Sequence, residues 1–317
     1  MKPDISIIIE WENYLLADIG RSLLMLERLK QQIPIVGKAV EVIVLFNPGQ
    51  IERSVLETEL FKILELNEGI TPFVLRVEEV SGKHYYELKN EGVKLATGEI
   101  ILFLDSDVIP EDGWLVNIVR PFYENTEIQV LAGNSYIDYE DVYSKAFALS
   151  WFFDLRLQER DIGIRNTGFY ANNVAFRKEV IGKHPFPEMP EGVTRGSCYM
   201  LYKQLERVGI PVWTNTAAQV SHPAPNGFSH FYTRALAEGR DHFLTDQPAF
   251  LDFFRNSYLE RIRRSVNRII QQRKEVNLSL WQTPVAIGIM TAYYSLYLMG
   301  GFIALSMPRY AKVSWRI

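Results

Sequence analysis

Two aspartates follow an uncharged, apolar run in the segment Ile100-Ile-Leu-Phe-Leu-Asp-Ser-Asp107. Five apolar residues in a row predict a strand that is buried on both faces, as in a parallel sheet. Asp105 and Asp107 then follow the carboxyl end of that strand, where open α/β sheets bind ligands. Carboxylates at this spacing can bind one divalent cation, and such a cation can hold a diphosphate. A surface turn is the competing interpretation, because Asp and Ser favour turns.

The elements that position these aspartates can be predicted from the pattern of apolar residues. Strands are predicted at 5–9, 40–46, 73–77 and 100–104, and helices at 15–33, 54–66, 85–96 and 112–123. The second half is less regular, with strands predicted at 128–132 and 173–176 and helices at 143–158, 199–208 and 226–243. Alternating strands and helices predict an α/β fold with a mixed, mostly parallel sheet flanked by helices.

Charge is unevenly distributed along the 317 residues. Residues 253–275 carry seven Arg or Lys and two Glu, a net +5, and residues 276–308 carry no charge. Residues 309–317 add +3, and because the whole chain carries −4, residues 1–252 carry −12. We expect no nucleic-acid partner, because phosphate contacts require a basic surface.

The C-terminal part differs from the rest, which predicts two domains, 1–245 and 246–317. Apolar residues recur at helical spacing in 254–270 among several arginines, as in a basic amphipathic helix on an anionic membrane surface. Residues 284–307 then carry no charge, and about 20 apolar residues suffice to span a bilayer. An ordinary surface helix and a buried core helix are the competing interpretations. We expect a C-terminal membrane-associated segment, either a single span or a re-entrant anchor.

Two further features concern the compartment. Cys198 is the single cysteine, so no internal disulfide is possible. The first residues lead directly into a strand pattern without the features of a signal peptide. Both features predict a reducing environment and therefore the cytoplasmic face of the membrane.

Two other motifs precede the aspartates at short spacing. They are Lys89-Asn-Glu-Gly92 and Ala96-Thr-Gly-Glu99. With Asp105-Ser-Asp107, the series resembles the family 2 glycosyltransferases of the GT-A (Rossmann-like) fold in order and spacing. The resemblance covers about residues 4–245. It implies transfer of a sugar from a nucleotide diphosphate sugar to a glycan or lipid-linked acceptor, usually with inversion.

The resemblance also implies roles for individual residues. Asp105, Asp107 and the late histidine His222 would bind Mn²⁺ or Mg²⁺, although His222 also fits a hydrogen-bonded loop histidine. The nucleotide-sugar-binding residues would be Glu10, Glu12, Asn13, Asn47, Asn90, Asp105, Ser106 and Arg195. The acceptor side would comprise Asn172, Asn173 and Arg234.

The chain departs from the family pattern at three places. The family's Pro-Thr-Tyr-Asn after the first strand is Glu10-Trp-Glu-Asn13, and its Asp-Asp-Gly-Ser after the second is Asn47-Pro-Gly-Gln50. The identity of the base therefore stays open. The family's Glu-Asp pair, whose Asp is the general base, falls on Ser197 and Cys198, and neither is a carboxylate.

Two upstream carboxylates could replace the missing base. Glu188 and Glu191 lie in a loop near the acceptor side, although solvated loop residues are the competing interpretation. The missing pair also fits a non-catalytic nucleotide-sugar-binding or scaffold protein at the membrane. A nucleotidyltransferase would need a glycine-rich, basic loop after the first strand, and residues 10–16 lack one. We therefore predict a metal-dependent, hexosyltransferase-like glycosyltransferase.

Overall fold

The computed structural model describes residues 2–12, 19–64, 73–159, 161–164 and 168–313. The chain forms two compact units, and each combines segments that are far apart in the sequence. The first unit contains Met1–Ser135, Arg156–Glu188 and Gly196–His222, and the second contains Tyr136–Leu155, Met189–Arg195 and Pro223–Ile317. The division into functional domains 1–245 and 246–317 stays a prediction.

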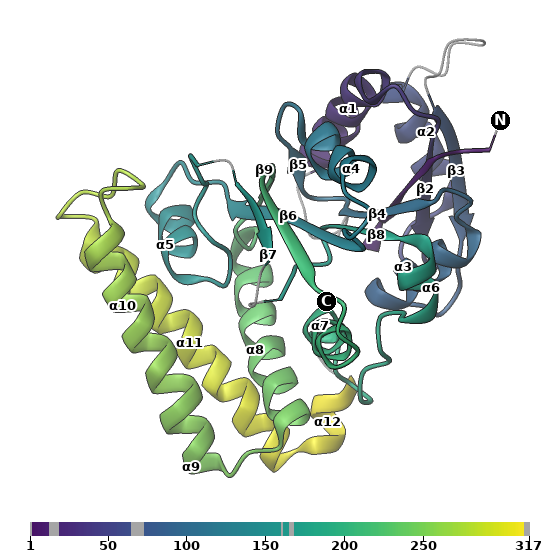
Figure 1. The fold of residues 1–317 in the computed structure, drawn as a ribbon. Coiled ribbons are helices and arrows are strands. Elements are labelled where there is room, and N and C mark those ends of the chain that lie inside the picture. Colours follow the sequence, from purple (N-terminus) through teal and green to yellow (C-terminus); the bar gives the residue numbers. More distant parts are fainter. Residues whose placement is uncertain (1, 13–18, 65–72, 160, 165–167, 314–317) are drawn as a thin grey trace. The chain divides into compact units, whose positions relative to one another are not determined.

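A mixed sheet forms the centre of the first unit (Figure 1). The described strands follow the order β3-β2-β1-β4-β8-β6-β9-β5, and β7 pairs with β9. Neighbouring strands are parallel among β1 (Ile5–Glu10), β2 (Val40–Phe46), β3 (Phe73–Glu79) and β4 (Ile100–Asp105). The antiparallel part contains β5 (Ile109–Pro110), β6 (Val130–Ile137), β7 (Ile162–Ile164), β8 (Asn173–Arg177) and β9 (Val212–His222). The predicted α/β class with a mixed sheet is confirmed.

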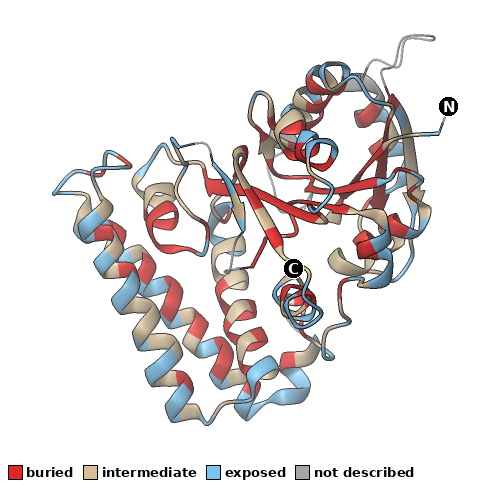
Figure 2. Ribbon diagram, in the orientation of Figure 1, coloured by how far each residue is buried: buried red, intermediate tan, exposed pale blue. Residues whose placement is uncertain are grey.

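Helices cover both faces of this sheet. Because successive side chains of a strand point to opposite faces, each central strand contributes to two separate cores. One core contains alternate β1 residues and side chains of α1 (Ile19–Val36), α2 (Arg53–Leu64) and α4 (Trp114–Glu124). The other core contains Ile8 of β1 and side chains of α3 (Tyr85–Leu95), α6 (Lys178–Lys183) and α7 (Ser197–Arg207). The central strands are therefore buried on both sides, as their red colour in Figure 2 shows.

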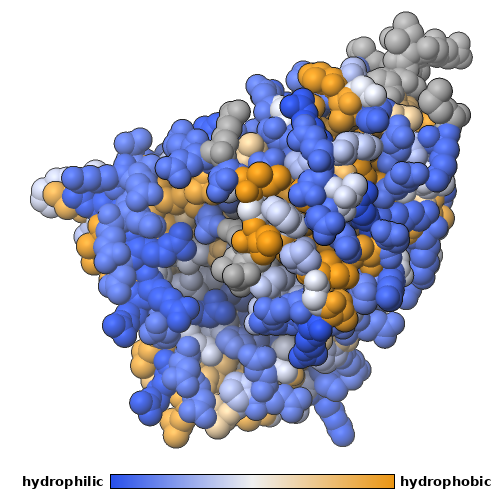
Figure 3. Space-filling model, in the orientation of Figure 1, coloured by the Kyte–Doolittle hydropathy of each residue, from blue (hydrophilic) through white to orange (hydrophobic). Residues whose placement is uncertain are grey.

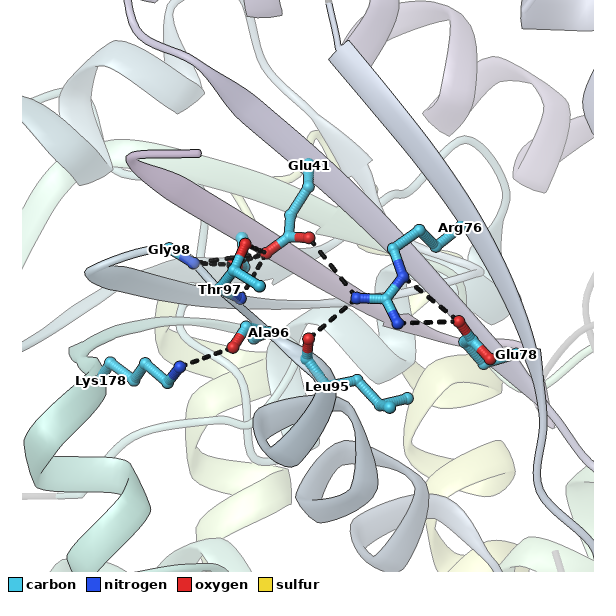
Figure 4. Close-up of polar contacts among 9 residues, drawn as sticks. Glu41, Arg76, Glu78, Leu95, Ala96, Thr97, Gly98 and Lys178 are labelled. Carbon is cyan, nitrogen blue, oxygen red and sulfur yellow. Dashed lines mark hydrogen bonds and ion pairs between the residues drawn. The ribbon is translucent and has the colours of Figure 1, made fainter. Parts of the chain in front are cut away.

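A polar cluster closes the turn between α3 and β4 at the amino end of the parallel strands (Figure 4). The buried carboxylate of Glu41 accepts hydrogen bonds from Ser6 Oγ and from the Thr97 backbone N–H, both at 2.6 Å. Burial alone raises the pKa of Glu41, but these hydrogen bonds bring the pKa below its usual value. A Cβ on Gly98 would lie 2.7 Å from the carbonyl carbon of Ile5. This part of the motif series therefore serves the fold by fixing where β4 begins.

The second unit is helical. It contains α5 (Val142–Ser150), α8 (Gly227–Asp246), α9 (Phe250–Asp252), the π-helical segment η2 (Phe253–Leu259), α10 (Glu260–Gln272), α11 (Thr283–Ser306) and α12 (Pro308–Val313). The backbones of α8 and α11 approach closely: a Cβ on Gly300 would lie 2.1 Å from Leu236 O. Among the described residues, α11 is the one helix that is long and apolar enough to cross a membrane, judged by length and composition.

Candidate active site

Glu10 and Asp105 are paired by the parallel register at the carboxyl ends of β1 and β4. Lys89 Nζ donates to Asp105 Oδ1 at 2.7 Å, and Tyr85 Oη donates to Asp105 Oδ2 at 2.8 Å. Burial, and then the charge of Asp105, raise the pKa of Tyr85 well above its usual value, so the phenol keeps its proton. Two side chains of α3 therefore hold the Asp105 carboxylate in place.

Lys89 has no assigned role in the sequence-based prediction, although it belongs to one of the motifs. Its side chain is fully buried, and its ammonium group also lies 4.6 Å from the centroid of the Tyr85 ring. The spacing of Tyr85, Lys89 and Val93 places all three on one face of α3. The sequence does contain a signal for this ion pair. Lys89 stands among apolar residues on the face of α3 that covers the sheet, and a lysine there needs a buried partner.

Asp107 and His222 meet at the same edge of the sheet. Asp107 Oδ2 lies 3.8 Å from His222 Nε2, and the two side chains are 8% and 13% exposed. Arg21 of α1 connects the two segments, because it donates to Asp107 O at 2.5 Å and to Ser221 Oγ at 2.8 Å. The sequence patterns did not predict this arginine, since its partners lie far from it in the chain.

The residues at this edge fit a divalent cation. Two atoms that are each about 2.1 Å from one cation lie about 3 to 4.2 Å apart, and the distance between Asp107 and His222 falls in this range. Ser106 Oγ is buried and has no hydrogen-bond partner among the described residues, and a bound ligand or water would satisfy such a group. Within the described part of the chain, no three His, Cys, Asp or Glu side chains gather into a metal-binding group. Binding of one cation by Asp105, Asp107 and His222 together stays a prediction. Asp107 and His222 alone would need further ligands from substrate and water.

The two glutamates at the carboxyl end of β1 differ in environment. Glu10 is fully buried, and burial, followed by the charge of Asp105, raises its pKa well above the usual value. Glu12 instead accepts a hydrogen bond from the Tyr85 backbone N–H at 2.6 Å and contacts His84 Nδ1 at 2.7 Å. A carboxylate is favoured there, because the amino end of a helix carries partial positive charge. Glu12 thus anchors the loop after β1 to α3.

The predicted asparagines near the nucleotide bind backbone groups. Asn47 Nδ2 donates to Lys83 O at 3.2 Å. Asn90 forms two hydrogen bonds with the backbone of Phe186. Its Nδ2 donates to Phe186 O at 2.9 Å, and its Oδ1 accepts from the Phe186 N–H at 3.0 Å. Both side chains hold loops in place, and their roles toward a nucleotide stay predictions. Asn13 lies outside the described residues.

The predicted acceptor-side asparagines lie inside the sheet. Asn173 Oδ1 accepts from Trp114 Nε1 at 2.8 Å, and Asn173 Nδ2 donates to Ala218 O at 2.9 Å. Asn172 Oδ1 accepts from Ser135 Oγ at 3.0 Å. These contacts connect β8 with its neighbours, and an acceptor role for either amide stays a prediction.

The start of α7, where the family places its general base, has no acidic side chain. Ser197 Oγ donates to Pro187 O at 2.7 Å, and Tyr86 Oη lies 3.3 Å from Cys198 Sγ. Burial raises the pKa of the Cys198 thiol, so the thiol stays protonated near neutral pH. Neither residue is suited to take a proton from an acceptor hydroxyl.

The two glutamates predicted as alternative bases belong to different units. Glu188 is exposed at the end of a segment of the first unit. Glu191 belongs to the second unit, where its carboxylate forms an ion pair with Lys312 Nζ at 2.7 Å. Both side chains are exposed, and the role of either as the base stays a prediction.

The two predicted arginines lie together in the second unit. Burial, and then the charge of Arg234, lower the pKa of Arg195 to about 10. Both terminal nitrogens of Arg195 are buried and form no hydrogen bond with the residues that the structure describes, although Asp241 Oδ2 lies 3.8 Å from one of them. The Arg234 guanidinium lies 5.1 Å from the centroid of the Trp151 ring. Two neighbouring cations with unused donors are suited to an anionic ligand.

Comparison with known proteins gives a family and a fold. Residues 73–184 match the family model described as Glycosyl transferase family 2, and this range includes the motif series around Asp105. No curated protein sequence matches the chain.

Two solved structures resemble the whole chain. S. aureus TarS, residues 1–349, has a TM-score of 0.52 and 12% identity over 96% of this chain and 91% of that chain. The mannosyltransferase PcManGT from Pyrobaculum calidifontis, solved with GDP-Man and Mn²⁺, has a TM-score of 0.50 and 15% identity. That match covers 99% of this chain and 84% of the mannosyltransferase. Residues 73–184 thus carry the match to the family 2 glycosyltransferases, and the chain has a GT-A-like fold.

Proposed function

We propose that this glycosyltransferase uses a nucleotide diphosphate sugar and Mn²⁺ or Mg²⁺ to glycosylate a glycan or lipid-linked acceptor with inversion. The observation that carries the proposal is the approach of Asp107 to His222 beside the fixed Asp105 carboxylate. Two similar structures support the donor and the cation. TarS has been solved with UDP-GlcNAc, and PcManGT has been solved with GDP-Man and Mn²⁺.

Each residue of the site has a distinct part in this proposal. Asp107 and His222 would hold the cation, and Asp105, oriented by Lys89 and Tyr85, would accept hydrogen bonds from the ribose. A bound cation would supply Lewis-acid stabilisation of the charge on the leaving diphosphate. Burial raises the pKa of Glu10, which disfavours a negative charge on this residue beside the nucleotide.

Further residues are proposed to act on the two substrates. Arg195 and Arg234 would bind an anionic group, which their buried and unused N–H donors support. Glu188 or Glu191, whose side chains are both exposed, would take the proton from the acceptor hydroxyl. We propose that the acceptor is at the cytoplasmic face of a membrane, where the apolar C-terminal segment would hold the enzyme.

Turnover of sugar nucleotides tests the proposed function. The purified chain is incubated with a panel of UDP- and GDP-sugars and Mn²⁺, with membrane lipid extract as the source of acceptor, and release of nucleoside diphosphate is measured. Asp107→Asn should lower the rate at least about 100-fold, because the leaving charge loses its stabilisation. Exposed Asp112→Asn, only five residues away, is the matched control and should retain the wild-type rate. Tight donor binding with no turnover in the wild type would contradict an enzymatic role.

A further inference from the structure

Helix α11 and the residues flanking it leave one side of the helix uncovered by protein. Its exposed side chains, named here the apolar stripe, are Trp281, Val285, Met299, Phe302, Leu305 and Met307, with exposures between 44% and 91%. Between the two halves of the stripe, the exposed residues 288, 291, 292 and 295 are small. The stripe also reaches α9, because the rings of Phe250 and Phe302 have centroids 5.8 Å apart. Apolar surface of this extent on one side of a protein marks an interaction site.

The hydrophobic surface is visible at one end of the helical unit. Figure 3 shows orange atoms at the lower end of this unit, around α9. Leu251 of α9 is 72% exposed, and Tyr310 and Val313 of α12 are 53% and 63% exposed. The apolar stripe therefore continues onto two neighbouring elements.

The opposite side of α11 is fixed to charged and polar groups. Tyr293 Oη donates to Glu238 Oε2 at 2.9 Å, and Glu238 also pairs with Arg261 of α10 at 3.2 Å. Tyr294 Oη donates to Ser150 O at 3.0 Å. To cross a bilayer as an isolated span, α11 would have to break these contacts and leave its partners unpaired. These contacts favour a helix that stays on α8 and exposes only its stripe.

The neighbourhood of the stripe is basic. Helix α10 packs beside α11. The side chains of Arg263 and Arg264 are 76% and 74% exposed and share one carboxylate, that of Glu260, so this group keeps a positive charge. Residues 253–275 carry a net +5, whereas α11 itself carries no charge. An uncharged apolar stripe next to basic residues is complementary to the surface of an anionic lipid bilayer.

We infer that the second unit docks on the surface of an anionic membrane with α11 lying in the plane of the bilayer. The apolar stripe enters the headgroup region, and the exposed Arg263 and Arg264 of α10 contact the lipid phosphates. This inference rests on the proposed function for its membrane-bound acceptor and replaces the predicted span or re-entrant anchor by surface docking.

Vesicle binding by the full chain tests this inference. Binding is measured by flotation with phosphatidylcholine vesicles alone and with about one-third phosphatidylglycerol added. The wild type should bind the anionic vesicles and be released by an alkaline carbonate wash. Trp281→Ser and Phe302→Ser should each weaken binding about tenfold, because each removes one large inserted side chain. The double variant with Arg263→Gln and Arg264→Gln should bind anionic vesicles about fivefold more weakly per arginine removed. Its binding to phosphatidylcholine vesicles should not change.

Ile35→Ser is the matched control, because Ile35 is 70% exposed on α1 of the first unit. It should leave vesicle binding unchanged. A wild type that resists the carbonate wash would show a span and overturn the inference. Equal binding by the wild type and both stripe variants would also overturn it. Sugar-nucleotide binding, measured on the same samples, separates failure of the docking surface from failure of the proposed function.

Discussion

The Asp105 carboxylate is held by groups inside the protein, which limits what it can do for a ligand. Lys89 and Tyr85 donate to it from α3, and Lys89 has no exposed surface. A carboxylate with two such donors is pre-oriented and does not have to reorganise when a substrate arrives. The neighbouring Asp107 has the imidazole of His222 close by, so the two aspartates are suited to different tasks.

Loss of the buried cation should be costly. Lys89→Met leaves Asp105 as an unpaired buried charge, and we expect a loss of about 3–5 kcal/mol in the free energy of unfolding. Urea denaturation measures this change. Lys94→Met is the matched control on the same helix, because the Lys94 side chain is 68% exposed and pairs with Glu91 at the surface. The control should lose less than about 1 kcal/mol. Equal small losses in both variants would contradict a structural role for the Lys89–Asp105 pair.

Glu10 should make stability depend on pH. The pKa of Glu10 is raised in the folded protein above its usual value of 4.5. Between these two pKa values the folded protein keeps a proton on Glu10 that the unfolded chain has released. The contribution of Glu10 to stability is therefore complete below that pKa and is lost as the pH rises through the folded-state pKa. Glu10→Gln removes this dependence, so the variant should gain stability relative to the wild type as the pH rises.

Urea denaturation of both proteins at mildly acidic and mildly alkaline pH checks this prediction. Glu99→Gln is the control, since the Glu99 side chain is 79% exposed. A stability difference between Glu10→Gln and the wild type that stays constant or shrinks with rising pH would contradict a raised pKa for Glu10.

At the scale of elements, the contact between α8 and α11 is set by glycine. A Cβ on Gly300 would lie 2.1 Å from Leu236 O, and backbone atoms cannot move aside as flexible side chains can. Gly300→Ala should therefore destabilise the second unit by about 1–3 kcal/mol. Gly288→Ala on the same helix meets no atom within 4 Å and should stabilise it by up to about 1 kcal/mol. Thermal unfolding of the two variants should shift in opposite directions, and a common direction would contradict the close packing of α8 and α11.

Several elements could be predicted because their sequence pattern has one physical meaning. Continuous apolar runs gave the strands β1, β2 and β4, since such runs are buried on both faces. The strand β9 was missed because its residues 214–217 are polar or small and three of them are only partly buried. The helix predicted over 143–158 is wrong beyond Ser150, where α5 ends. Its aromatic residues after Ser150 continue the apolar pattern but belong to a loop, so periodicity alone could not place the end.

The candidate site was predicted in part. Asp105, Asp107 and His222 were identified from motifs, and the structure brings Asp107 and His222 together. The partners that fix them could not be predicted in the same way. Arg21 reaches Ser221 across 200 positions of sequence, and only the folded sheet makes them neighbours.

At the scale of the whole molecule, the two units have different chemistry. The first carries the Asp107–His222 pair and the fixed Asp105 at the carboxyl ends of its strands. The second carries the buried arginines, the apolar stripe and the basic helix α10. The proposed cation and sugar-nucleotide site belongs to the first unit, and the proposed membrane-docking surface belongs to the second.

The central claim is that Asp107 and His222 hold a divalent cation that binds the diphosphate of the donor. Calorimetric titration of UDP and GDP into the wild type and Asp107→Asn, each with and without Mn²⁺, tests it most directly. We predict that Mn²⁺ tightens binding to the wild type at least about tenfold and leaves binding to the variant unchanged. Equal affinities in all four titrations would contradict the claim.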